Sequence, residues 1–271
     1  MNLLVFLGAC VGIGVVSGFL GGLLGIGGGV VIVPMLIILL DALAFLPPGE
    51  VTAVAVATSL ACVLFTSLSA ATAQLRAGMV DWAIARRWAP FVILGSYLAG
   101  WVATALPVAV FRGLIGTFLL FVAVVMLTRW RPAAHRQPPG TLLSAGLGST
   151  GGLISGIAGI GGGNVIVPTL VYFNVPVHRA TATSSALGVP IALAGTLGYV
   201  TVGYGLDLGP GMVGYLYVPG FLAIVCSAVI AAPLGVRTAH AVEAQPLRQG
   251  FGALLLLVSA RMLNTAWTTA P

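Results

Sequence analysis

Long apolar runs constrain this chain more than any other feature of its sequence. A helix needs about 20 apolar residues to cross the hydrocarbon core of a membrane. Charged residues make up only 6% of the chain, whereas a water-soluble domain usually carries about a quarter. The sequence therefore predicts an all-α polytopic membrane protein that crosses the cell (cytoplasmic) membrane several times. Six uninterrupted runs are long enough to be spans: Val51–Leu75, Trp88–Leu106, Phe111–Arg129, Ala180–Val202, Val213–Val236 and Leu247–Trp267.

Two longer apolar runs, Leu3–Leu40 and Leu142–Phe173, contain nearly the same glycine-rich motif. "GIGGGVVIVP" begins at Gly25 and "GIGGGNVIVP" begins at Gly159. As one helix, the first run would be about 57 Å long, close to twice the thickness of the hydrocarbon core. Because glycine and proline disfavour helices, we expect each run to form a helix, a break and a second, shorter helix. The sequence leaves open whether each pair is a re-entrant hairpin or two full spans.

The two halves of the chain resemble each other in more than the glycine motif. "ATS" begins at Ala57 and again at Ala182, and "RGLIGTFLLFVAVVML" from Arg112 parallels "RQGFGALLLLVSARML" from Arg248. Three matching segments in the same order indicate an internal duplication. We expect a first transmembrane repeat over residues 1–130, a cytoplasmic linker over 131–140 and a second transmembrane repeat over 141–271. Each repeat would hold a glycine-broken helix followed by three transmembrane helices.

The distribution of arginines between the runs predicts the orientation of these repeats. Arginines occur in the gap after Leu75, in the mid-chain linker and before Ala180 and Leu247, but not in the gaps 41–50 and 203–212. Cytoplasmic loops of membrane proteins are enriched in arginine and lysine, and this rule fits only if the second half is inverted relative to the first. Inverted repeats are common among secondary transporters. Arg112 is the exception, and we expect Arg112 and Arg248 to anchor their helices by extending to the membrane surface.

The glycine motifs are candidate anion sites. The first N–H groups of a helix have no intrahelical acceptor and carry the positive end of the helix dipole. Two such helix starts facing each other near the membrane midplane would form one positively polarised pocket. The alternative is that the glycines serve only close helix packing. The expected ligands are the backbone amides of Gly27, Gly28, Gly29, Gly161, Gly162, Gly163 and Asn164, with the Asn164 side chain added in the second half.

Hydroxyl side chains follow each glycine motif in the chain. Hydroxyls and amides suit a tetrahedral oxyanion, although hydroxyls in apolar helices more commonly bond to a neighbouring helix or to their own backbone. We expect four of these residues to contact substrate: Thr58, Ser59, Thr183 and Ser184.

The remaining ionisable residues offer little chemistry. The five acidic residues, Asp41 among them, fall near predicted helix ends and are expected to be solvated. His178 is the histidine nearest the second hydroxyl group and is the candidate for proton coupling. The histidines have no metal-ligand spacing, and no basic or catalytic pattern is evident. We therefore expect no enzyme activity, no cofactor, no metal site and no nucleic-acid partner.

The doubled glycine motif, each copy followed by a Thr-Ser pair, resembles the TauE/SafE family of membrane permeases, also called the sulfite exporter or toluene-sulfonate uptake family. "GFLGGLLGIGGGVVIVPML", "RAGMVDW", "GLISGIAGIGGGNVIVPTL" and "HRATATSSA" are similar to the family pattern. Many members have a histidine shortly before the "G-x-V-D" stretch, where this chain has Gln74. The resemblance covers nearly the whole chain and implies transport of sulfur-containing anions across the cytoplasmic membrane.

The sequence therefore favours a secondary transporter that exports sulfite or an organosulfonate by alternating access, with proton coupling as an option. Two alternatives remain open: a channel-like uniporter for small anions, and a non-transporting membrane scaffold subunit. The expected partners are the small anion and membrane lipid, and a homodimer is compatible with the sequence.

Overall fold

The computed structural model describes residues 3–24, 28–44, 46–128, 140–241 and 244–268, and these form a bundle of α-helices. Seven of the described helices are long and apolar enough to cross a membrane. The prediction of an all-helical, multi-pass membrane protein is confirmed. The predicted linker, residues 131–140, lies outside the described residues except for Gly140.

The first half of the chain contains a broken pair of helices followed by three long helices, as the sequence predicts. The 14-residue α2 is about 21 Å long, too short to cross the core by itself. The helices of this half are α1 (Leu3–Leu24), α2 (Gly29–Ala42), α3 (Val51–Arg76), α4 (Trp82–Ala105) and α5 (Val108–Thr128).

The second half repeats this order, with a small hairpin added. Its second helix, α7, has only 10 residues and is also too short to span the core. The elements of this half are α6 (Thr141–Ala158), α7 (Gly163–Tyr172), α8 (Val177–Val202), β1 (Met212–Val213), β2 (Leu216–Tyr217), α9 (Val218–Ala241) and α10 (Ala244–Thr268).

The start of α9 differs from the sequence prediction, which placed the span from Val213. The structure instead turns the chain into the β1–β2 hairpin, in which Val213 pairs with Leu216. Gly214 lies at the turn with a φ of +56°, a left-handed conformation that glycine adopts without steric cost and that tight hairpin turns require. Apolarity alone could not distinguish this short hairpin from the first turn of a helix.

The first helix of each half packs against the fourth helix of the other half. α1 lies along α9, and α6 lies along α4. The contacts correspond, because Gly18 of α1 lies against the backbone of Ala228 and Gly152 of α6 lies against the backbone of Val92, with no room for a β-carbon at either glycine. Small residues allow helix backbones in a membrane to approach this closely. These matched contacts are what an internal duplication would produce.

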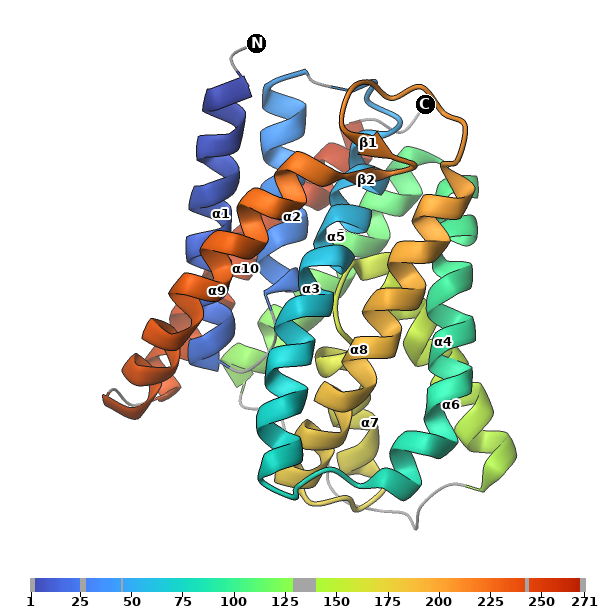
Figure 1. Cartoon of the computed structure of the whole chain (residues 1–271), viewed down its shortest axis with the longest axis vertical. Helices are drawn as coiled ribbons and strands as arrows, with labels where there is room; N and C mark the ends of the chain where they lie inside the picture. Colours follow the sequence, from blue (N-terminus) through green and yellow to red (C-terminus); the bar gives the residue numbers. More distant parts are fainter. Residues whose placement is uncertain (1–2, 25–27, 45, 129–139, 242–243, 269–271) are drawn as a thin grey trace.

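The two broken helix pairs approach the centre from opposite ends of the bundle (Figure 1). α1 begins and α2 ends at the end of the β1–β2 hairpin, which we call the hairpin end, whereas α6 begins and α7 ends at the opposite end. Each interrupted run therefore starts and finishes at one end of the bundle, as a helical hairpin does. The connections α3–α4 and α7–α8 lie at the end of the bundle opposite β1–β2. We call this the arginine end, because Arg76 ends α3 and Arg179 lies in the first turn of α8.

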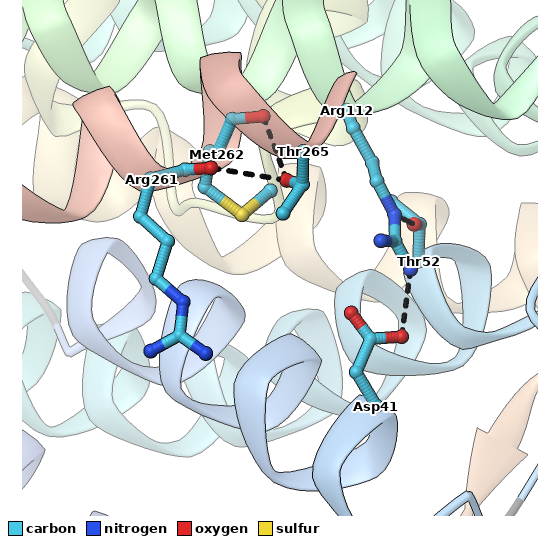
Figure 2. A network of polar contacts seen from close by, with 6 residues as sticks. All are labelled: Asp41, Thr52, Arg112, Arg261, Met262 and Thr265. Carbon is cyan, nitrogen blue, oxygen red and sulfur yellow. Dashed lines mark hydrogen bonds and ion pairs between the residues drawn. The ribbon is translucent and has the colours of Figure 1, made fainter. Parts of the chain in front are cut away.

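An ion pair between a buried arginine and a partly exposed aspartate fixes the end of α2. Arg112 of α5 donates from Nη2 to Oδ1 of Asp41 at 2.8 Å and from Nε to Oγ1 of Thr52 at 3.1 Å. Figure 2 shows these three side chains pointing toward one another. The Arg112 side chain is 6% exposed and that of Asp41 is 36% exposed. The expectation that Arg112 extends to the membrane surface is therefore wrong, since a carboxylate and a hydroxyl within the bundle satisfy its charge. The side chain of Arg248 lies outside the described part of the chain.

The two partners of this pair differ in burial, and this difference predicts an asymmetric response to mutation. Asp41→Asn leaves a buried guanidinium without its carboxylate and should lower the free energy of unfolding by about 3–5 kcal/mol. Arg112→Met leaves a partly exposed carboxylate and should cost less, about 1–2 kcal/mol. Thermal and denaturant unfolding of the purified variants in detergent measures both losses. The double variant should be more stable than Asp41→Asn alone, and equal losses in the two single variants would contradict the explanation.

Candidate functional site

The two glycine breaks meet in the middle of the bundle. A β-carbon built on Gly29, at the start of α2, would lie 2.6 Å from the carbonyl oxygen of Gly159 and 3.2 Å from Cα of Ile160. Val63 of α3 lies between the breaks, because its two methyl groups would each come within 2.8 Å of a β-carbon on Gly29 or Gly161. The structure therefore brings together the two segments that the sequence singled out. Gly27 lies outside the described residues.

The first break is closed by packing. Gly28, Gly29 and the following residues through Pro34 are buried. A β-carbon on Gly28 would lie 3.3 Å from Cβ of Ser17 on α1, so α1 covers this side of the break. At Gly28 and Gly29, therefore, the structure shows the close packing that was the alternative interpretation of the motif.

The second break is more open and conformationally specialised. Gly161, Gly163 and Asn164 are partly exposed. Gly159 and Gly162 have φ angles of +71° and +81°, a left-handed conformation that costs other residues roughly 1 kcal/mol or more. The first hydrogen bonds of α7 run to the Gly162 carbonyl from Val165 and Ile166. The N–H groups of Gly163 and Asn164 precede these bonds and have no acceptor within the helix.

Thr58 and Thr183, two of the four hydroxyl residues predicted to contact substrate, make equivalent hydrogen bonds in the two halves. Thr58 Oγ1 accepts from the N–H of Tyr217 at 3.2 Å, and Thr183 Oγ1 accepts from the N–H of Asp81 at 3.0 Å. Tyr217 is the residue before α9 and Asp81 is the residue before α4. Both threonines are buried. Each therefore ties a long helix to the start of another helix, although its own O–H remains a donor.

The two predicted serines are not equivalent. Ser59 Oγ donates to the carbonyl of Gly159 at 2.9 Å and so ties α3 to the second break. Ser184 is 1% exposed, and its Oγ has no hydrogen-bond partner among the described residues. Nδ2 of Asn164 is likewise buried and unpaired within the described part of the chain. Buried polar groups nearly always have a partner, so these two donors are candidates for ligand contact.

Ser67 is a polar residue near the second break that the sequence analysis did not select. A β-carbon on Gly161 would lie 2.8 Å from Ser67 Oγ, and one on Gly188 of α8 would lie 2.9 Å from the same atom. Ser67 is 8% exposed. It lies two turns after Ser59 on one face of α3, and this helical spacing was the signal that could have identified it.

His178 lies apart from this centre. It is exposed in the first turn of α8, about 9 Å along the helix axis from Ser184. Among the described residues, no group of three histidine, cysteine, aspartate or glutamate side chains is placed to hold a metal ion.

The difference between Ser59 and Ser184 gives a stability test. Ser59→Ala leaves the buried Gly159 carbonyl without its donor and should lower the free energy of unfolding by about 1–3 kcal/mol. Ser184→Ala is the matched control, because it removes a hydroxyl that has no described partner, and it should change stability by no more than about 0.5 kcal/mol. Thermal unfolding in detergent measures both. Equal destabilisation by the two variants would contradict the assignment.

Comparisons with known proteins agree with this architecture. The chain is 29% identical over 259 residues to a probable membrane transporter protein of Haemophilus influenzae, covering 95% of this chain and 98% of the relative. It is 27% identical over 263 residues to a probable membrane transporter protein of Methanocaldococcus jannaschii, covering 93% of each. No solved structure matches the chain. The model of the family described as sulfite exporter TauE/SafE matches residues 10–262. The chain therefore belongs to the TauE/SafE family of membrane proteins.

Proposed function

We propose that this protein is a secondary transporter that exports a small sulfur-containing anion, sulfite or an organosulfonate, across the cytoplasmic membrane by alternating access. The observation that carries the proposal is the meeting of the two glycine breaks inside the bundle, with Gly29 against Gly159. Irregular backbone is tolerated at membrane depth only where protein or a water-filled cavity covers it. Secondary transporters place their substrate sites at such broken helices near the midplane. Membership of a family described as sulfite exporters supports the class of substrate.

An inverted repeat is part of this proposal. The broken pairs α1–α2 and α6–α7 come from opposite ends of the bundle, as Figure 1 shows. Arg76 ends α3 and Arg179 lies in the first turn of α8, both at connections of the arginine end. The positive-inside rule places this end in the cytoplasm. In this proposal, rocking of one repeat against the other alternately opens the central breaks to each side of the membrane.

Transport by the purified chain in proteoliposomes tests the proposal. Vesicles loaded with unlabelled sulfite or an organosulfonate should take up the labelled anion by exchange. Gly162→Leu should reduce this uptake at least tenfold, because leucine does not tolerate the φ of +81° and its side chain would displace Ile191. Gly12→Leu is the matched control, since nothing lies within 4 Å of a β-carbon there.

Two outcomes of this experiment matter. If Gly162→Leu does not fold, as judged by gel filtration and melting, Asn164→Val takes its place, because it removes a buried unpaired amide without changing the backbone. Absence of flux from the well-folded wild-type chain would contradict a transporter and favour a scaffold subunit.

Proton coupling is tested separately at His178. Histidine is the side chain whose charge changes near physiological pH, and His178 is exposed at the arginine end of α8. An imposed pH gradient should accelerate uptake several-fold in the wild-type protein. His178→Gln should abolish this acceleration while leaving exchange without a gradient unchanged. Flux that is indifferent to the gradient in the wild-type protein would favour a uniporter.

A further inference from the structure

The two glycine breaks are not equivalent binding sites. We propose that the substrate anion binds off-centre, at the second break alone, and that Ser67 of α3 is one of its ligands. This inference rests on the proposed function and specifies its site: neutral donors from α3, α7 and α8 would hold the three oxygens of a sulfite or sulfonate group.

The described part of the first break, which begins at Gly28, is unsuited to an anion. The carbonyl oxygen of Gly159 lies against Gly29, at the start of α2. A carbonyl oxygen carries partial negative charge, so it offsets the positive end of the α2 dipole where an anion would otherwise bind. Residues Gly28 to Pro34 are also buried. Ser17, the serine beside this break, donates to the carbonyl of Gly14 on its own helix at 3.2 Å.

Within the described part of the chain, the second break instead has donors without an acceptor. The N–H groups of Gly163 and Asn164 precede the first hydrogen bond of α7. Nδ2 of Asn164 and Oγ of Ser184 are buried without a hydrogen-bond partner in the described part of the chain. Ser184 lies one turn before Gly188 on the same face of α8, and Gly188 packs against the carbonyl of Gly161. The Ser184 hydroxyl therefore lies on the same face of α8 as Gly188, which contacts the second break at Gly161.

Ser67 adds a further hydroxyl to these donors, from α3, the helix that packs along α8. Its Oγ lies beside both Gly161 and Gly188, within 2.9 Å of the β-carbons that these glycines lack. The residue four positions after Ser59 is Val63, whereas the residue four positions after Ser184 is Gly188. The methyl groups of Val63 lie against both Gly29 and Gly161, and Ser67 Oγ lies against Gly161 and Gly188.

The chemistry of the set fits a sulfur oxyanion. All of these donors are neutral, so they bind an anion by hydrogen bonds without a fixed opposite charge that would slow its release. Hydrogen bonds to a charged group are stronger than those between neutral groups. An SO₃ group presents three acceptor oxygens, and donors from three different helices can reach them from different directions.

The experiment compares the two serines that flank the two breaks. Purified wild-type protein, Ser67→Ala and Ser17→Ala are titrated with sulfite and with ethanesulfonate by calorimetry, and their melting temperatures are measured without ligand. Ser67→Ala should weaken binding roughly tenfold or more, the usual cost of losing one hydrogen bond to a charged group. Ser17→Ala, the matched control, should leave the dissociation constant within twofold. Both variants should melt within a few degrees of the wild type.

The possible results separate the site from the function. Wild-type affinity in Ser67→Ala, or weakened binding in Ser17→Ala alone, would overturn the off-centre site while leaving the transporter proposal intact. A folded wild-type protein that binds neither anion would overturn the proposed function and the site with it. If Ser67→Ala melts far below the wild type, Asn164→Val replaces it, and unchanged binding in that variant overturns the site.

Discussion

The contact between Gly29 and the carbonyl of Gly159 is the interaction on which the rest of the structure depends. Two helical hairpins from opposite ends of the bundle can approach this closely at Gly29 because glycine has no side chain there. Ser59 then fixes the contact by donating to the same carbonyl. Ser59 belongs to α3, which packs along α8, so this contact also positions the helix that carries Val63 and Ser67.

Some of the contacts around this point are equivalent in the two halves, but the polar groups near the two breaks differ. Thr58 and Thr183 make equivalent hydrogen bonds to the starts of α9 and α4, so the two halves share their framework. Two of the differences near the breaks are Val63 against Gly188 and Val30 against Asn164. Equivalent contacts in the two halves are thus compatible with different side chains around the two breaks.

The sequence was sufficient to predict what depends on local pattern. Helix lengths follow from the apolar runs, and the breaks follow from the glycines, whereas Pro34 and Pro168 lie inside α2 and α7. The sequence was insufficient where contacts between residues far apart in the chain determine how a side chain is placed. The pairing of Arg112 with Asp41 joins residues far apart in the chain, and no local pattern distinguishes it from an arginine that reaches the surface. Ser67 was missed for the same reason, since one serine in an apolar helix is informative only once Gly161 and Gly188 are placed beside it.

The pairing of α1 with α9 and of α6 with α4 has a consequence for how the chain is made. Synthesis proceeds from the N-terminus, so α1 is inserted into the membrane long before α9 exists. Until then the close-packing face of α1, with Gly14, Gly18 and Gly22, has only lipid or temporary neighbours. The first half cannot reach its final packing alone, because the partners of α1 and α4 both belong to the second half. The final packing of α1 and α4 is therefore reached only after helices of the second half have entered the membrane.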